Sequence, residues 1–413
     1  MSEYTPRRKR LSISRFDTMQ MHTRHPLITV WWAASFAGFG QMKVGSYAKG
    51  YLLVLLEILI NMGAQLNLAI VYSFTGRFEL AKEVLDIRWI LAYVAIYGYG
   101  LWDSYNLTVS MNTQAVLASR EKAPIDVFKM MPFSINFLDK RTPWVTIFWS
   151  MVLPGLGHMY SLRMLTGYFL IGFTLISAYL SRLLEGIHFT FLGDFSQATA
   201  ILDPQWLLFL PSIYLYAVHE SYSSVVELNK IFDVEQREFL QKRYQNFTLE
   251  LPFLKTKESA EALITATFDH SSFVELAVTE LEDKGIEKEK ILAIPLVQEN
   301  DKDFAILDTI HRADGISIID TAGVTGTIGM TLGVIYGFIW TWGPMIWGLI
   351  GLTGGIASGL ILDYLLTKRK LGVHRKDKSS ELVLIVSCDK KNSDMVEKVL
   401  RDNTALGVGI VKD

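Results

Sequence analysis

The chain has 413 residues, half of them hydrophobic, and a formal net charge of -2. Its apolar residues gather in charge-poor blocks, and blocks of roughly 20 apolar residues are typical of segments that cross a bilayer. A single cysteine, Cys388, excludes a disulfide framework and a multi-cysteine metal site. We therefore predict an α-helical polytopic membrane protein.

The first 23 residues are basic and polar. No short hydrophobic core with a small-residue cleavage site follows them, so no signal peptide is predicted. A basic run can bind nucleic acid, but beside a membrane entry point it more often sets the orientation of the chain. We predict a cytoplasmic arm over 1–23 and no nucleic-acid partner.

Residues 24–112 align with 141–229 without a gap, and 27 of the 89 aligned pairs are identical. This identity indicates an internal repeat. Each copy is predicted to contain a short apolar run, a turn, a full-length helix and a third apolar segment. These elements are expected at 28–39 and 144–156, about 50–73 and 167–187, and 89–108 and 206–225. Closely spaced Gly and Pro break a helix, and the turn residues are Gly38, Gly40, Pro154, Gly155 and Gly157.

At this turn the second copy reads PGLGHMY over 154–160, followed by Gly167. The segment resembles small bacterial two-helix membrane domains that carry a PGxGQxY signature at the bend of a hairpin. His158 replaces the Gln of that signature, and the first copy keeps Gln41 but lacks the Pro and the Tyr. The resemblance implies a membrane module and no particular reaction.

Lys and Arg mark the cytoplasmic side of a membrane protein. The arm and the stretches 113–142 and 230–257 are rich in these residues, whereas 185–205 has several acids and no Lys or Arg. The basic stretches are therefore predicted to be cytoplasmic, which requires an even number of crossings per copy. The first apolar run would then be re-entrant or interfacial. The alternative, three spans per copy with inverted copies, occurs in transporters.

The last third of the chain changes in character. Strand–helix–strand patterns are expected over 262–297 and again over 381–412, and two such βαβ halves suffice for a ferredoxin-like α/β domain. Between them, 322–366 is apolar and bent at 341–344, which predicts a transmembrane hairpin. The cytosolic domain would thus be split by this hairpin.

Glycines recur every three or four residues on both arms of the hairpin, and small residues at that spacing let membrane helices pack closely. They serve either a tight intramolecular hairpin or a face for self-association. The glycines predicted to pack are Gly326, Gly329, Gly333, Gly337, Gly348, Gly351, Gly355 and Gly359. This region resembles small bacterial stress-associated membrane proteins with a glycine-rich hairpin, which implies membrane association and a link to envelope stress.

Acids occur at one equivalent position of the two copies, Asp103 and Glu220, each followed by Ser-Tyr. An acid within a membrane segment marks an ion path or a buried partner, but near the interface it can also be wetted. In the sharper hypothesis both acids face a shared cavity with Tyr105 and Tyr222. Glu57 lies in a polar helical stripe with Asn61, Gln65 and Asn67, and either lines a passage or hydrogen-bonds a neighbouring helix.

No catalytic residues, metal site or cofactor are predicted. His158 and His219 lack ligand spacing and are interpreted as satisfied polar residues. A cluster before the hairpin could bind a metal, but an amphipathic interfacial helix explains it better; it comprises Asp308, His311, Asp314 and Asp320. No phosphate-binding glycine loop, nucleophile elbow or zinc motif occurs.

The sequence thus favours a non-enzymatic protein of the bacterial cytoplasmic membrane, multi-pass, with both termini cytoplasmic. It would be an oligomerising scaffold or an envelope or stress factor whose cytosolic domain binds a protein partner. The alternative is a channel or transporter gated by that domain, with Asp103, Glu220 and Glu57 on the pathway. The predicted order is an arm (1–23), copy one (24–112), a linker (113–140), copy two (141–229), a linker (230–257), the first βαβ half (258–300), the hairpin with its preceding interfacial segment (301–370) and the second half (371–413).

Overall fold

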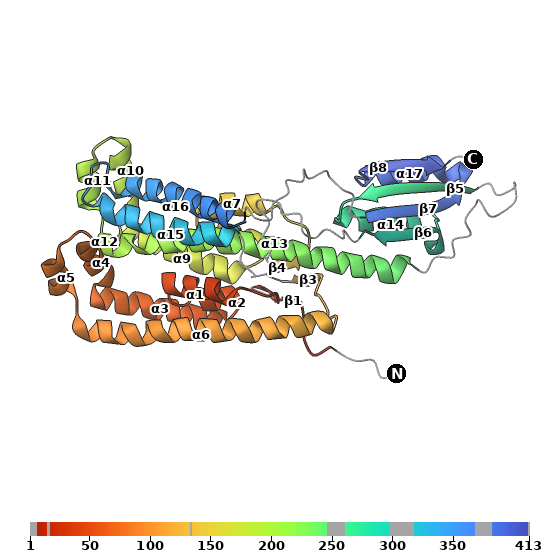
Figure 1. Cartoon of the computed structure of the whole chain (residues 1–413). Helices are drawn as coiled ribbons and strands as arrows, with labels where there is room; N and C mark the ends of the chain where they lie inside the picture. The colour runs from red at the N-terminus through yellow and green to blue at the C-terminus, as the bar shows by residue number, and fades with distance from the viewer. Residues whose placement is uncertain are drawn as a thin grey trace. The chain divides into compact units, whose positions relative to one another are not determined.

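The computed structural model describes residues 6–14, 17–132, 134–245, 261–296, 318–367 and 382–411. The chain divides into two compact units (Figure 1). Unit 1 comprises Met1–Phe137, Thr142–Glu227 and Ile306–Leu371, and unit 2 comprises Leu138–Arg141, Leu228–Ala305 and Gly372–Asp413. Residues 246–260, 297–317 and 368–381 lie outside the described residues, and with them the predicted interfacial segment before the hairpin.

Unit 1 is mostly helical. Two of the described helices are long and apolar enough to cross a membrane, α3 (Tyr47–Ala64) and α16 (Gly343–Thr367), and up to five spans result if each bent helix pair counts as one. The other helices are α1 (Pro26–Ser35), α2 (Phe39–Val44), α4 (Leu66–Phe74), α5 (Phe78–Val84), α6 (Ile87–Arg120), α7 (Pro143–Val152), α8 (Leu156–Tyr160), α9 (Met164–Leu180), α10 (Leu183–Phe191), α11 (Phe195–Ile201), α12 (Pro204–Leu207), α13 (Phe209–Tyr244), which continues into unit 2, and α15 (Ile318–Gly337).

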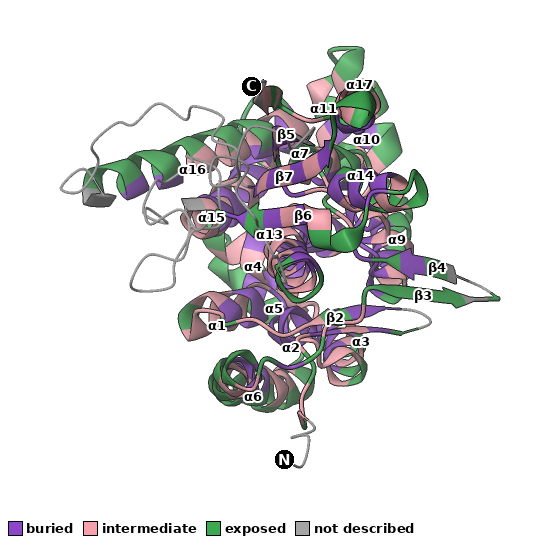
Figure 2. Cartoon of the chain, turned by 90° about the vertical axis from the view of Figure 1, so that its right-hand side faces the viewer, coloured by how far each residue is buried: buried purple, intermediate pink, exposed green. Residues whose placement is uncertain are grey.

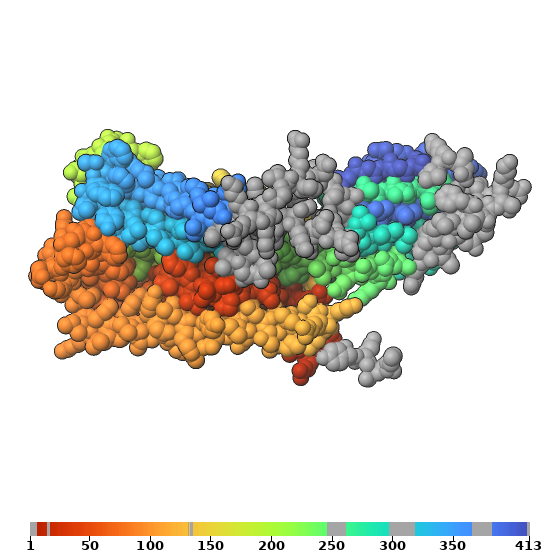
Figure 3. Space-filling model, viewed as in Figure 1, coloured from red at the N-terminus to blue at the C-terminus, as the bar shows by residue number. Residues whose placement is uncertain are grey.

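The third segment of each copy is longer than the sequence predicts. Helix α6 runs to Arg120 and α13 to Tyr244, so both continue into the stretches expected to be linkers. The outer face of α6 is apolar and exposed, with Leu91, Val94 and Trp102 each more than 60% exposed. Figure 2 shows this green face looking along the helix, and Figure 3 shows α6 (orange) along one side of unit 1 and α15–α16 (blue) along the other. A long apolar exposed face is typical of contact with lipid or with another protein.

A short β-hairpin that was not predicted precedes each copy. Strands β1 (Leu11–Ile13) and β2 (Thr18–Gln20) pair antiparallel, as do β3 (Phe128–Met131) and β4 (Ser134–Phe137). Leu11 pairs with Gln20, and Phe128 pairs with Phe137, at the same offset of 117 residues as the aligned copies. The structural correspondence therefore begins upstream of residue 24.

The same backbone contacts recur at that offset. The Asn112 side chain bonds both backbone groups of Arg24, and the Asn229 side chain does the same for Arg141. The two glycine turns also match. A Cβ on Gly40 would collide with the Thr29 carbonyl and the Ala33 and Ser104 side chains, and a Cβ on Gly157 would collide with the equivalent residues, Thr146, Ser150 and Ser221.

The short helices α1 and α2 lead the chain into unit 1 and back beside α6. The backbone just before α1 bonds to Asn112, whereas the Ala34 carbonyl near the end of α1 accepts a bond from the Tyr97 hydroxyl. Asn112 and Tyr97 lie about four turns apart on α6, or roughly 22 Å. Lys49, in the first turn of α3, then pairs with Asp103, between those two levels. The chain therefore turns back beside α6 between α1 and α3.

Helices α15 and α16 pack through their glycines. A Cβ on Gly329 would collide with the backbone of Gly351, and a Cβ on Gly333 would collide with the backbone of Trp347. Gly355 likewise faces the backbone of Thr325. These glycines therefore pack inside the chain, in the intramolecular hairpin that was one of the two predicted alternatives.

Unit 2 contains a four-stranded antiparallel sheet in the order β6-β7-β5-β8. Its strands are β5 (Glu261–Phe268), β6 (Ile291–Pro295), β7 (Leu382–Asp389) and β8 (Gly407–Val411), and its helices are α14 (Ser272–Asp283) and α17 (Ser393–Asp402). Side chains alternate along β5 and β7, and one face of the sheet forms a core with both helices. The strand–helix–strand halves lie on either side of α15 and α16 in the sequence.

Candidate functional site: a buried charge cluster

Glu220 lies at the centre of a buried cluster of charges in unit 1. Its two carboxylate oxygens contact Lys43 Nζ, at 3.2 Å, and the Arg163 guanidinium. The side chains of all three are less than 10% exposed. One acid is thus held by two cations, and each cation comes from a different copy of the repeat.

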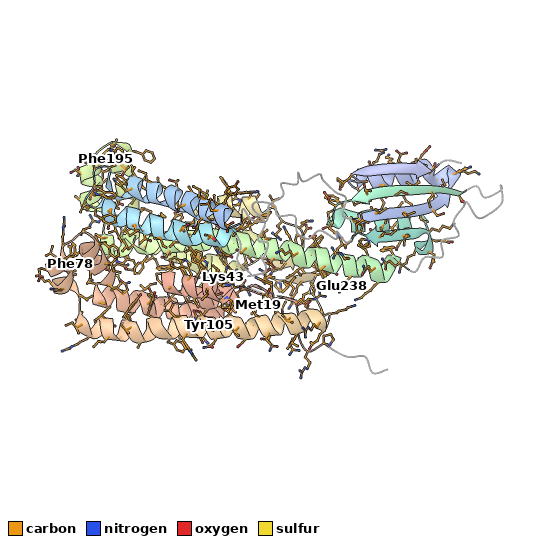
Figure 4. All side chains as sticks on the ribbon, viewed as in Figure 1. Met19, Lys43, Phe78, Tyr105, Phe195 and Glu238 are labelled. Carbon is orange, nitrogen blue, oxygen red and sulfur yellow. The ribbon has the colours of Figure 1, made fainter. Side chains whose placement is uncertain are left out.

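Breaks in the helices present these cations to Glu220. Lys43 is on the six-residue helix α2, which is bounded by Gly38 (φ 101°) and Gly45 (φ 94°) in left-handed conformations. Arg163 directly precedes α9, after the short helix α8. Glu220 is on the long helix α13. Because the chain breaks around Lys43 and Arg163, their side chains reach one point on α13. Figure 4 shows Lys43 in the middle of the helices of unit 1.

The cluster continues on both sides of Glu220. On one side, Lys43 Nζ lies 3.4 Å from His219 Nδ1, and His219 Nε2 lies 2.7 Å from Asp320 Oδ1 on α15. On the other side, Asp17 in the first hairpin lies 3.9 Å from Arg163 Nε and accepts a hydrogen bond from Thr166 at 3.3 Å. We call Asp17, Lys43, Arg163, His219, Glu220 and Asp320 the charge cluster.

Burial of separate charges is costly, whereas a close pair repays much of that cost through mutual attraction and hydrogen bonds. The charge cluster joins the first hairpin, both copies and the glycine hairpin, since Asp17, Lys43, Arg163 and Asp320 belong to different parts of the sequence. Removal of one member leaves its partners uncompensated. The arrangement therefore fixes how the parts of unit 1 pack.

The equivalent acid of the first copy has separate partners. Asp103 accepts hydrogen bonds from Gln41 Nε2 at 3.0 Å and from Lys49 Nζ at 2.9 Å. Tyr105 is 46% exposed, and Figure 4 labels it on α6. Tyr222 is buried and packs against Trp144. The structure therefore places the two acids in different networks and does not bring the two tyrosines together around them.

Glu57 hydrogen-bonds a neighbouring segment. It accepts from the backbone N–H of Ala37, at the break after α1, and from the Tyr93 hydroxyl at 3.3 Å. A broken helix leaves backbone N–H groups without intrahelical partners, and Glu57 satisfies one of them. Of the two predicted roles, the observed contacts match the neighbour bond.

The amides of the polar stripe form hydrogen bonds at the break between α3 and α4. Gln205 donates to Asn61 Oδ1 at 2.7 Å, and Asn61 donates to Asn67 Oδ1 at 3.0 Å. Gln65 lies between α3 and α4 in a left-handed conformation (φ 53°). These amides therefore satisfy polar groups where α3 ends and α4 begins.

Among the described residues, no group of three or more His, Cys, Asp or Glu side chains could hold a metal ion. Three members of the cluster weighed as a metal site, Asp308, His311 and Asp314, lie outside the described residues. The fourth, Asp320, contacts His219. His219 is therefore hydrogen-bonded, as predicted. The same prediction is wrong for the buried His158, since neither of its ring nitrogens has a hydrogen-bond partner in the described part of the chain.

Sequence reasoning found Glu220 but missed Asp17, Lys43 and Arg163. The available signal was the difference between the copies rather than their likeness. At the offset of 117, Lys43 corresponds to Tyr160, and Arg163 corresponds to Ser46. A charge in one copy opposite an uncharged residue in the other marks a position where the copies have distinct roles.

The described residues define a class: a mostly helical protein with small sheets and two helices apolar enough to span a membrane, or up to five spans if each bent helix pair counts as one. Comparison of the chain with protein-family models, curated proteins and solved structures gives no match.

Asp17 makes stability depend on pH. Burial raises the pKa of its carboxyl from 3.8 to about 6, although Arg163, the Thr18 backbone and the Thr166 hydroxyl act to lower it. A raised folded-state pKa contributes stability that is complete below pH 4 and is lost as the pH rises through 6. The shift of roughly two pH units corresponds to about 3 kcal/mol.

As the pH rises from 4 to 7, the unchanged protein should therefore lose up to about 3 kcal/mol of stability that Asp17→Asn keeps, so the difference between the two should shift in favour of the variant. Denaturant unfolding in detergent at several pH values measures this. Asp402→Asn, at an exposed position of unit 2, is the control. A constant difference between Asp17→Asn and the unchanged protein across this range would contradict the expectation.

Proposed function

We propose that this chain is a multi-pass protein of the bacterial cytoplasmic membrane, with both termini in the cytoplasm. Unit 1 is its membrane body, built from two same-sense copies of one module and the glycine hairpin α15–α16. The two to five apolar helices support this proposal, as does the apolar exposed surface of α6. The recurrence of contacts 117 residues apart supports the duplication.

We further propose that unit 2 is a cytosolic ferredoxin-like domain split by the hairpin. In a βαββαβ unit, the fourth strand pairs with the first, and the first with the third. With β5, β6, β7 and β8 counted as strands one to four, the order β6-β7-β5-β8 has this arrangement. The face of the sheet opposite the helices carries Leu292, Val383 and Ile385, each partly exposed, and is the proposed surface for a protein partner.

The function that the geometry favours is that of a non-enzymatic scaffold, which forms homo-oligomers and takes part in envelope maintenance or stress. One observation carries this choice: Glu220, the acid most suited to an ion path, is neutralised by Lys43 and Arg163. An acid that must bind and release ions during transport is poorly served by two fixed cations. The buried ion pairs of the charge cluster instead stabilise one packing of the membrane body.

The alternative is a channel or transporter gated by unit 2. It draws support from the ionisable groups buried in unit 1, since such groups mark pathways in membrane proteins. In that case Asp103 and Glu220 would both line the ion pathway. The alternative therefore requires that neutralising either acid abolishes flux while the protein stays folded.

Ion flux into liposomes that contain the purified protein tests the two proposals. We expect the same flux as in protein-free liposomes for the unchanged protein, Asp103→Asn and Glu220→Gln, and a multiple of the monomer mass by native mass spectrometry. Ile385→Glu, on the open face of the sheet, should reduce protein–protein association without loss of folding. Flux that both acid variants abolish while their circular dichroism is unchanged would contradict the scaffold proposal and favour transport.

A further inference from the structure

A cavity of about 260 Å³ lies in unit 1 beside the charge cluster. It is bounded by the β1–β2 hairpin, the end of α2, the first turn of α3 and one side of α6. Its charged lining residues are Lys9, Arg24 and Arg163, and no acidic side chain is among the described residues that line it. The lining therefore favours an anion.

Two buried donors line this cavity without a hydrogen-bond partner in the described part of the chain. Arg163 is 3% exposed, and its Nε has no hydrogen bond, since Asp17 Oδ1 is 3.9 Å away. Thr18 is also 3% exposed, and its Oγ1 has none. Buried polar groups are nearly always hydrogen-bonded. These two donors are therefore available to a ligand in the cavity.

The Arg24 guanidinium is a third donor. Its one described hydrogen bond is to the His22 carbonyl at 3.5 Å, and no carboxylate within ion-pair distance is found among the described residues. Its backbone is held independently by Asn112, because both backbone polar groups bond that side chain. The Arg24 side chain thus lies at the cavity, and the fold does not use its charge in an ion pair with a described residue.

The N-terminus of α3 adds to the positive potential. This 18-residue helix begins at Tyr47, and its N-cap Ser46 makes no side-chain capping bond. Gly45 and Tyr47, on either side of that cap, both line the cavity. Uncapped N–H groups and the positive end of the helix dipole attract phosphate groups.

We propose that this cavity binds a phosphate monoester or diester group. Arg24 neutralises the phosphate, with further positive charge from Lys9, which also pairs with Asp126 at 2.9 Å, and from Arg163, which also pairs with Glu220. The Thr18 hydroxyl and Arg163 Nε donate to the phosphate oxygens. Met19, Met21 and Met111 line the remaining wall and accept an apolar substituent, such as the acyl chain of a lipid. At about 30 Å³ per water molecule, the cavity has room for a group of this size.

The phosphate can come from a membrane phospholipid headgroup or from a free phosphate ester. The lipid source rests on the proposed membrane location, whereas binding of inorganic phosphate does not. The purified full chain in detergent is titrated with inorganic phosphate at constant ionic strength, with thermal unfolding as the readout. In parallel, native mass spectrometry measures bound phosphatidylglycerol, with phosphatidylcholine as the comparison lipid.

We expect the unchanged protein to bind one or both probes, and Arg24→Gln to lower the affinity about tenfold, the usual effect of losing a hydrogen bond to a charged group. Thr18→Val removes only an unpaired hydroxyl, so it should fold normally and weaken binding severalfold. Lys82→Gln, at an exposed residue far along the chain, should bind normally. Preference for phosphatidylglycerol over phosphatidylcholine assigns the lipid source, and a response to phosphate without that preference assigns the free ester.

The proposal is overturned if neither probe binds, or if Thr18→Val, folded as judged by circular dichroism, binds both probes as tightly as the unchanged protein. Failure of the phospholipid arm alone would count against the lipid source and leave the phosphate site in place. Failure of the scaffold proposal in the flux experiment would not affect either arm.

Discussion

Glu220→Gln is expected to lower the free energy of unfolding by about 3–5 kcal/mol, the usual cost of removing one partner of a buried ion pair. The variant leaves Lys43 and Arg163 buried without their shared carboxylate, because both contact Glu220. Their side chains are 7% and 4% exposed, so water replaces little of the lost interaction. Denaturant unfolding of the purified protein in detergent measures the loss.

The repeat supplies the matched control. Asp103 occupies the equivalent position, but its cationic partner Lys49 is 39% exposed. Asp103→Asn should therefore cost only about 1 kcal/mol, as for partly solvated ion pairs. Equal losses in Asp103→Asn and Glu220→Gln would show that the position, and not the buried cations, determines the cost.

Gly351→Leu is expected to prevent the close packing of α15 against α16. Even a Cβ at this position would collide with the Gly329 carbonyl, and backbone atoms cannot move aside as a side chain can. We expect a loss of about 3 kcal/mol or more, at the upper end of the range for overpacked sites. Cysteines introduced on the two facing helices should cross-link in the unchanged protein and lose that cross-link in the variant.

Gly354 is the control for this substitution. It lies on the same helix, and a Cβ there meets nothing within 4 Å among the described residues. Gly354→Leu should keep the cross-link, with at most a small change in stability. Loss of the cross-link in both variants would mean that bulk on α16 disrupts the helix itself rather than its glycine interface.

Much of the helical plan could be predicted because hydrophobicity and repetition are local in the sequence. The glycine spacing at 326–337 and 348–359 indicated a close helix pair, and the structure shows the contacts inside the chain. The lengths of α6 and α13 could not be predicted, since their last turns carry polar residues that resemble a linker. The β1–β2 hairpin was missed because three-residue strands carry almost no periodic signal.

The charge cluster could be predicted only in part. Glu220 was conspicuous as an acid in an apolar segment, but its partners lie 177 and 57 residues away. Lys43 and Arg163 occur beside turns, where a basic residue is ordinarily solvated. Only the folded backbone, with its breaks on either side of α2 and before α9, brings them to Glu220. The comparison of unlike residues between the copies was the one sequence signal for them.

The central claim is that two same-sense copies of a membrane module leave every basic stretch and unit 2 on the cytoplasmic side. Single cysteines at Lys122, Lys398, Lys82 and Asp194, in a Cys388→Ser background, test it most directly by labelling with an impermeant maleimide in intact and in opened cells. Lys82 is in α5, Asp194 precedes α11, and all four positions are exposed. We expect the positions 82 and 194 to react in intact cells, and 122 and 398 to react only after opening. Labelling that places 122 and 398 on opposite faces of the membrane would contradict the account.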